Sequence, residues 1–306
     1  MIASPAGLKQ PGWPLLEKRK RGAEAASGKR KAEGRKAEGR KQEAEGRETE
    51  DRKPKAESRR QGNGRQKAGR RGGGLEALRY IEENLMIQDK TGALRPFLFN
   101  APQRALYAEV RRQQQAGLPV RVIILKARQI GFSSAVAALF YQRAATTPNT
   151  NAMIVAHKAE ASANIFNKIK LFWECSPPAV RPMKKAGNAH ALLLENPSSR
   201  AEDRLRDPGL RSRITIESAG NREAGRSATI QLLHLSELAF WPYAGQAMAA
   251  LMQAVPPLPQ TMVVIESTAN GVGGAFYREW QRAAEGRSAF VPLFFPWFSD
   301  PAYRMA

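Results

Sequence analysis

The chain has 306 residues and carries 49 Lys and Arg against 28 Asp and Glu, a formal net charge of +21. This excess, without an apolar run near the ~18 residues of a membrane span, points to an anionic polymer as partner rather than to a membrane. The single cysteine, Cys175, excludes an internal disulfide, and three dispersed histidines do not suggest a zinc site. The N-terminus lacks the apolar segment of a signal peptide, so we expect a cytoplasmic protein.

Residues 1–74 form a low-complexity stretch with 22 Lys and Arg against 10 Asp and Glu. The sequence of residues 32–36 recurs at 37–41, and large apolar side chains are almost absent from residues 18–74. Because such a segment cannot bury enough apolar surface to offset the entropy of ordering, we predict a disordered basic tail. It could be an arm that binds DNA, a solvated tail without a specific partner, or an extension from an upstream start codon.

Periodic apolar patterns begin at residue 75 and predict an ordered domain over residues 75–306. Leu75, Leu78, Ile81 and Leu85 recur at helical spacing, and a second helix is predicted from Pro102 to residue 115. Apolar, β-rich runs alternate from there with a helix-like stretch at residues 165–173. This alternation indicates an α/β domain with a mainly parallel sheet covered by helices on both faces. The runs are residues 120–125, 152–156, 230–235 and 262–265.

Residues 121–134 form a candidate phosphate site, because an apolar strand enters a short loop before a helix that begins near Ser133. Loop N–H groups and the helix N-terminus can surround a triphosphate, and a hydroxyl there can bind Mg²⁺. Gly131 and Ser133 match the pattern G-x-x-x-x-G-K-[ST]. Lys126 replaces the first Gly and Phe132 replaces the Lys, so an ordinary strand–turn–helix is the alternative.

The segment from Lys126 to Ser134 resembles the deviant Walker A motif of bacteriophage terminase large subunits, in which the lysine lies at the start of the loop. The resemblance implies a P-loop NTPase fold of the ASCE type and Mg-ATP as ligand. Lys126 would then neutralise β/γ-phosphate charge, and Arg128 would stabilise charge in the transition state. Ser133, or Ser134 in its place, would hold Mg²⁺. The other loop residues implied in nucleotide binding are Ala127, Gln129 and Gly131.

Residues 97–103 resemble the adenine-recognition segment of terminases and end in Gln103. A side-chain amide offers both a donor and an acceptor to the edge of a base. A purely structural role at a helix start is the alternative for Gln103.

Residues 230–237 are an apolar strand that ends in an acid, which is the layout of a Walker B motif. A carboxylate at a strand's carboxyl end faces the ligand crevice, so Glu237 is the candidate base for the attacking water. Ser236 stands where the general pattern has an Asp that holds Mg²⁺ through water, and a neutral hydroxyl would do so more weakly.

Residues 263–271 resemble the terminase coupling motif, in which Ser267, Thr268 and Asn270 would sense the γ-phosphate. A plain turn is the alternative.

The loop at residues 217–227 carries Arg222 and Arg226, and Arg226 is a candidate arginine finger, a salt-bridge partner or a DNA phosphate contact. Residues 196–213 contain several arginines and suggest a basic mobile loop.

The resemblance implies an ATPase motor that drives double-stranded DNA into a procapsid, working with a portal protein and a terminase small subunit as a homo-oligomeric ring in the bacterial host. The C-terminal nuclease of terminase large subunits is not expected in this chain, since the strand-like run at residues 290–295 lies close to its end. Two alternatives are open: a helicase-like nucleic-acid ATPase, and a truncated or split-gene prophage remnant that binds nucleotide or DNA without turnover.

Overall fold

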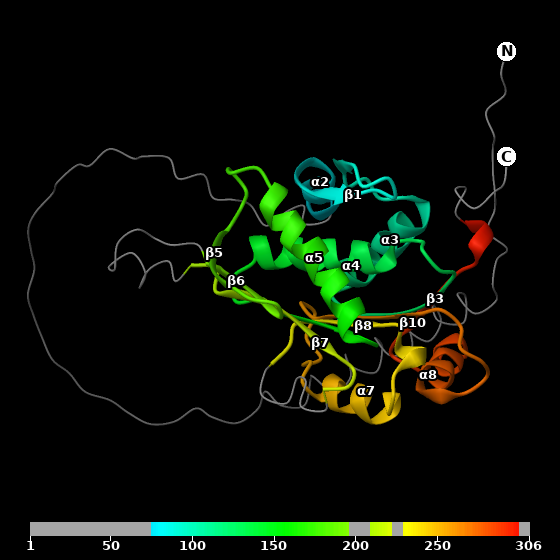
Figure 1. Ribbon diagram of the computed structural model, residues 1–306. Helices are drawn as coiled ribbons and strands as arrows, with labels where there is room; N and C mark the ends of the chain where they lie inside the picture. The colour runs from blue at the N-terminus through cyan, green and yellow to red at the C-terminus, as the bar shows by residue number, and fades with distance from the viewer. Residues whose placement is uncertain (1–74, 196–208, 222–228, 300–306) are drawn as a thin grey trace, which may run out of the picture. The chain divides into compact units, whose positions relative to one another are not determined.

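The computed structural model describes residues 75–195, 209–221 and 229–299 (Figure 1). The tail predicted over residues 1–74 lies outside the described residues, as do Arg222, Arg226 and residues 196–208 of the predicted basic loop. The domain opens with helix α2 (Leu75–Asn84), a small hairpin of β1 (Met86–Gln88) and β2 (Leu94–Pro96), and helix α3 (Ala101–Gln115).

A sheet of eight strands forms the centre of the described part of the chain, in the spatial order β10-β3-β9-β8-β4-β7-β6-β5. The strands from β10 to β7 are parallel, whereas β6 and β5 pair antiparallel at one edge. The strands are β3 (Val120–Lys126), β4 (Asn151–Ala156), β5 (Met183–Gly187), β6 (Ala191–Glu195), β7 (Ser212–Ser218), β8 (Leu232–Ser236), β9 (Met262–Ser267) and β10 (Val291–Phe295).

The order of the central strands confirms the predicted fold class. Strand β9 lies between β3, which enters the predicted phosphate loop, and β8, which precedes Glu237. This additional strand between the two motif strands is the arrangement of ASCE-type P-loop NTPases. Because parallel strands end at the same edge of a sheet, all three strand ends meet there.

Helices cover both faces of the sheet (Figure 1). On one face α4 (Phe132–Thr146) and α5 (Ala159–Cys175) pack with α2 and α3, and on the other lie α7 (Ala244–Gln253) and α8 (Gly274–Ala284). Two short 3-10 turns, η1 (Leu238–Phe240) and η2 (Trp297–Ser299), follow β8 and β10. No helix of the described part is long and apolar enough to cross a membrane.

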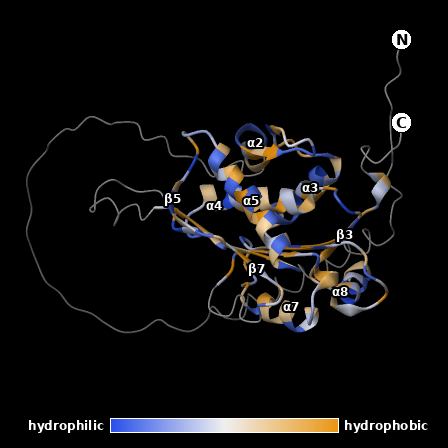
Figure 2. Cartoon of the chain, in the orientation of Figure 1, coloured by the Kyte–Doolittle hydropathy of each residue, from blue (hydrophilic) through white to orange (hydrophobic). Residues whose placement is uncertain are grey.

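The period-2 alternation of the strands divides their side chains between two apolar cores. On β9, Val264 packs into the core under α4, whereas Val263 and Ile265 pack into the core with α7 and α8. The strands are accordingly coloured mainly as hydrophobic in Figure 2. Helix α4 is apolar on nearly every side, as a helix buried beneath a second helical layer should be.

The helices and strands predicted from apolar periodicity are confirmed. Most bounds shift by one or two residues, but α5 begins six residues before the predicted helix-like stretch at residues 165–173. Strands β5, β6 and β7 were not predicted. The prediction of a loop up to residue 213 is wrong at its end, because Ser212 and Arg213 belong to β7. Strand β6 pairs with both residues along one edge, and β4 pairs with Arg213 along the other. Buried alternate residues such as Ile214 and Ile216 make this strand part of the core.

Candidate functional site

The carboxyl ends of β3, β8 and β9 bring four polar side chains together. Lys126 ends β3, Ser236 ends β8, and Glu237 follows it directly. Glu266 lies near the end of β9, where Ser236 is its register partner across the strand pair. By alternation along their strands, Lys126, Ser236 and Glu266 point to the face that α4 covers.

Helix α4 begins at this same edge, after a loop that the structure ties to α3. Gly131 precedes the helix with a φ of +85°, a left-handed conformation that favours glycine. Gln103 Nε2 donates to the Gly131 carbonyl oxygen at 2.9 Å, and Asn100 Nδ2 donates to the Ile130 carbonyl oxygen at 3.1 Å. A Cβ at Gly131 would lie 2.7 Å from Gln103 Nε2, so this position requires glycine on two grounds.

Asn100 and Gln103 also form a capping box at the start of α3. The Asn100 side chain accepts from the Gln103 backbone N–H, and the Gln103 side-chain oxygen accepts from the Asn100 backbone N–H. Both ends of the Gln103 amide therefore contact the protein in this structure. Adenine recognition by Gln103 stays a prediction.

The Lys126 ammonium is buried between two carboxylates. Its Nζ lies 2.7 Å from Glu237 Oε1 and 3.7 Å from Glu266 Oε2, and its side chain is 7% exposed. Burial acts to lower the pKa of Lys126, but the charges of Glu266 and Glu237 outweigh burial and hold the pKa above its ordinary value. Lys126 is therefore a fixed positive charge at the start of the loop that connects β3 to α4.

Glu266 is a completely buried carboxylate that the sequence interpretation did not single out. Its Oε1 accepts from the Ser133 hydroxyl, from Ser236 Oγ at 3.1 Å and from His234 Nε2 at 3.1 Å. Burial would raise the pKa of Glu266, but the charge of Lys126 and the hydrogen bonds from His234 and Ser133 lower it to about 2. The sequence signal that could have identified Glu266 was a charged residue inside an otherwise apolar strand.

Glu237 occupies a left-handed turn, with a φ of 55°, between β8 and η1. Its Oε2 accepts from the Thr268 backbone N–H at 3.0 Å, from Thr268 Oγ1 at 3.2 Å and from Ser267 Oγ at 3.3 Å. A non-glycine residue in this conformation is held there by its surroundings. The turn leaves the side chain 22% exposed, so Glu237 can reach solvent where Glu266 cannot.

Other residues proposed for nucleotide binding lie farther from this cluster or face elsewhere. The Ala127 N–H donates to the Phe295 carbonyl oxygen at 2.9 Å, while Arg128 and Gln129 are exposed on the loop. Ser134 faces α5, where Lys168 Nζ donates to its Oγ at 2.7 Å. Asn270 is exposed, and its Nδ2 donates to the Ala239 carbonyl oxygen at 2.9 Å.

Phe132, which stands where the general P-loop pattern has its lysine, is a core residue. It is buried and packs against Phe295 of β10, with ring centroids 4.7 Å apart. A lysine at this position would have to leave the core to reach a phosphate. Lys126, from the opposite end of the loop, is the lysine that forms ion pairs with Glu237 and Glu266.

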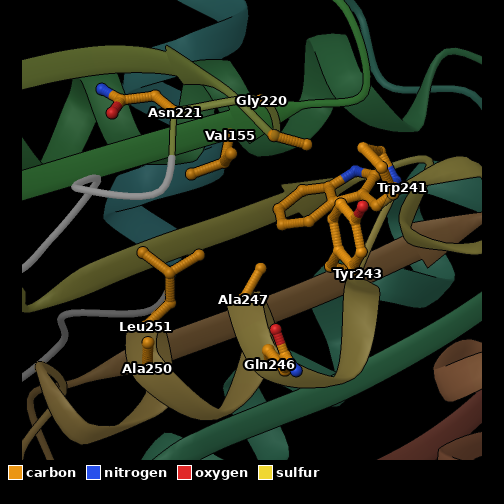
Figure 3. A pocket seen from close by; sticks show the side chains of 11 residues that line it. Val155, Gly220, Asn221, Trp241, Tyr243, Gln246, Ala247, Ala250 and Leu251 are labelled. Carbon is orange, nitrogen blue, oxygen red and sulfur yellow. The ribbon is translucent and has the colours of Figure 1, made fainter.

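A separate pocket lies on the other face of the sheet, beside α7 (Figure 3). Trp241 and Tyr243 approach each other at one end of it, and Leu251 and Val155 lie farther along its walls (Figure 3). None of the residues predicted to bind nucleotide lines this pocket. One of its lining residues, Trp241, is hydrogen-bonded to the end of β8: Trp241 Nε1 donates to the Ser236 carbonyl oxygen at 2.9 Å.

The side chains at the strand ends fit a magnesium nucleotide better than a metal alone. Within the described ranges, no group of three His, Cys, Asp or Glu side chains could hold a metal ion. A serine hydroxyl, one lysine and nearby carboxylates are the groups that would hold Mg²⁺ only together with phosphates and water.

No protein-family model matches the chain. Among solved structures, the large terminase of bacteriophage HK97 matches with a TM-score of 0.55 and 15% identity, over 73% of this chain and 43% of that protein. The large terminase ATPase domain of Thermus phage P74-26 matches with a TM-score of 0.47 and 18% identity, over 64% of this chain and 80% of that domain. The chain therefore has the fold of a bacteriophage large terminase, over a region that spans less than half of the HK97 protein.

Proposed function

We propose that the chain binds Mg-ATP at the carboxyl edge of its sheet and hydrolyses it. The observation that carries this proposal is the convergence of Lys126 and Ser133, from one strand–loop–helix segment, with Glu237, from a separate segment, around the buried carboxylate of Glu266. A helix N-terminus and a buried lysine attract a polyphosphate, and a partly exposed carboxylate beside them can act on water.

Lys126 and the loop bind the phosphates in this proposal. The γ-phosphate competes with Glu237 for Lys126 Nζ, because Glu237 Oε1 lies 2.7 Å from Lys126 Nζ in the structure. Arg128 and the backbone of Gln129 and Gly131 lie along the polyphosphate. Ser133, rather than Ser134, is the magnesium ligand, because Ser133 faces the carboxylate cluster and Ser134 faces Lys168.

Glu237 orients the attacking water and accepts its proton. The water oxygen then bonds to the γ-phosphorus as the bond to the β–γ bridging oxygen breaks, which gives ADP and phosphate. Mg²⁺, when bound, neutralises negative charge on the phosphate oxygens. Ser267 and Thr268 hold Glu237 through hydrogen bonds, so loss of the γ-phosphate can be passed to the segment after β9. Asn270 would take part in that transmission from its contact with η1.

We further propose that hydrolysis drives double-stranded DNA in phage genome packaging, in a homo-oligomeric ring on a portal protein with a small-subunit partner. The shared fold with a large terminase and the net charge of +21 support this assignment. Arg226 would act as an arginine finger toward a neighbouring subunit. In the test, double-stranded DNA should stimulate ATP turnover, and the stimulation should fall steeply with salt.

Two variants test the nucleotide site. Glu237→Gln should lower the ATP turnover rate by about 10²- to 10⁴-fold, as expected for removal of a general base, while binding of the fluorescent analogue mant-ATP changes little. Lys126→Met should weaken mant-ATP binding itself. Exposed residues supply matched controls in Glu83→Gln of α2 and Lys185→Met of β5, which should leave both readouts unchanged.

Circular dichroism and melting temperature must show that each variant is folded at the assay temperature. Unchanged turnover in folded Glu237→Gln would overturn the catalytic assignment. Wild-type protein that binds mant-ATP but shows no turnover, with or without DNA, would favour the alternative of a nucleotide-binding remnant.

A further inference from the structure

Glu266 is a buried carboxylate at the centre of the site, in a strand whose other side chains toward α4 are apolar. Met262 and Val264 share its face of β9 and belong to the hydrophobic core. Burying a carboxylate costs free energy unless it is paired and hydrogen-bonded. The groups that contact Glu266 must therefore offset the free energy that its burial costs.

Those groups are two serine hydroxyls, a histidine ring and the Lys126 ammonium, at the predicted magnesium position. Glu266 Oε1 accepts from the Ser133 hydroxyl at the start of α4 and from Ser236 Oγ at 3.1 Å. His234 Nε2 lies 3.1 Å from the same oxygen, and this hydrogen bond helps to hold the carboxylate in position. The other oxygen, Oε2, has no hydrogen-bond partner among the described residues and lies 3.7 Å from Lys126 Nζ.

Ser236 occupies the strand position at which the general Walker B pattern places a carboxylate. Glu266 is the register partner of Ser236 on the adjacent strand, and both side chains point to the face that α4 covers. A glutamate one strand away can therefore deliver its carboxylate to the region that an aspartate at position 236 would occupy. The longer glutamate side chain spans the distance between neighbouring strands.

We propose that Glu266 supplies, from β9, the magnesium-positioning carboxylate that β8 lacks at Ser236. This inference rests on the proposed nucleotide site. Because the Ser133 hydroxyl donates its hydrogen to Glu266, its oxygen lone pairs are left for the cation. Ser236 is then a second donor that orients Glu266 rather than a ligand of the magnesium shell.

The two glutamates of the site take different roles in this arrangement. Glu237 is partly exposed and can reach an attacking water, whereas Glu266 is fully buried and cannot. Glu266 is thus a positioning residue, and its removal should change the dependence on Mg²⁺ more than the affinity for the nucleotide itself. Loss of a group in the second coordination sphere commonly weakens metal affinity by about 10- to 100-fold.

The experiment measures binding of the fluorescent nucleotide mant-ADP to the full chain, first in EDTA and then over a titration of MgCl₂. In Glu266→Gln, we expect the Mg²⁺ concentration for half-maximal enhancement of binding to rise at least about 10-fold, with affinity in EDTA changed less than about 3-fold. In the double variant Ser236→Asp with Glu266→Gln, a carboxylate returns on the neighbouring strand, and the Mg²⁺ dependence should return toward that of the wild type.

Glu279→Gln is the matched control, because Glu279 is also a buried carboxylate that accepts from a serine hydroxyl, Ser288, but it lies on α8. It should leave the Mg²⁺ dependence unchanged. If Glu266→Gln does not fold, Ser133→Ala gives the second measurement and should raise the Mg²⁺ requirement similarly. Full Mg²⁺ enhancement in folded Glu266→Gln, or in Ser133→Ala, would overturn the inference. Absence of mant-ADP binding by the wild type would instead overturn the proposed nucleotide site.

Discussion

The ion pair between Lys126 and Glu266 can be tested by a double-mutant cycle on folding stability. The two charges lie 3.7 Å apart, and both side chains are buried. At an effective dielectric constant of about 20, two unit charges at this separation interact by about 4.5 kcal/mol. Removing Lys126 should therefore leave the Glu266 charge in the core without its lysine partner.

Lys126→Met should lower the free energy of unfolding by about 3–5 kcal/mol, the range seen when one partner of a buried pair is removed. Glu266→Gln should cost less, because Lys126 keeps Glu237 as a partner at 2.7 Å. The double variant should be more stable than the sum of the single effects predicts, by a coupling free energy of about 2–4 kcal/mol. Glu237 is partly exposed, so its own coupling to Lys126 is more strongly screened by solvent.

Urea unfolding followed by circular dichroism measures the four free energies. The control cycle uses Arg79→Met and Glu83→Gln on α2, a pair whose side chains are 75% and 54% exposed, and its effects should be additive. Additive effects in the Lys126 and Glu266 cycle as well would refute the reasoning. They would mean that the buried charges do not sense each other at the distance in the structure.

Three further predictions follow from the loop and from Glu266. Gly131→Ala should lower stability by more than the ~1–2 kcal/mol of a left-handed alanine, since its Cβ also meets Gln103, and it should weaken mant-ATP binding. Gly117→Ala, at a φ of +67° with open space around its Cβ, should show the strain alone and bind nucleotide normally; equal effects of the two substitutions in both assays would contradict this. Asn100→Ala should cost about 0.5–2 kcal/mol in urea unfolding through loss of the α3 cap, and a neutral result would show that the capping box contributes nothing. The pKa of Glu266 is lower in the folded state, at about 2, than its ordinary value of 4.5, so the folded protein binds fewer protons there and stability falls as the pH drops from about 4.5 to about 2. Urea unfolding over this range should show the advantage of wild type over Glu266→Gln shrinking with acidification, and a constant difference would contradict the lowered pKa.

Much of the fold could be predicted because apolar periodicity is a local signal. The strand at β3, the glycine before α4 and the apolar strand before Glu237 each lie within a short stretch of sequence. Strands β5 and β6 escaped prediction for a physical reason. The β5 residues are all exposed, so β5 shows no apolar alternation and is held at the sheet edge by its pairing with β6. Strand β6 is a short apolar run, and a run of this length does not by itself distinguish a strand from a helix segment.

Residues of the candidate site could be predicted only where the signal for each one lies in the short stretch of sequence around it. Lys126 and Glu237 were singled out as candidates because each lies at the carboxyl end of a recognisable strand, and in the structure they contact each other. Glu266 could not be found in this way, since its relation to Ser236 depends on the register between β8 and β9. A search along the chain finds Ser236 where it expects a carboxylate and infers a weakened magnesium site. Across the strand pair, a carboxylate is present beside Ser133, so in the proposed nucleotide site the serine at position 236 need not impair hydrolysis.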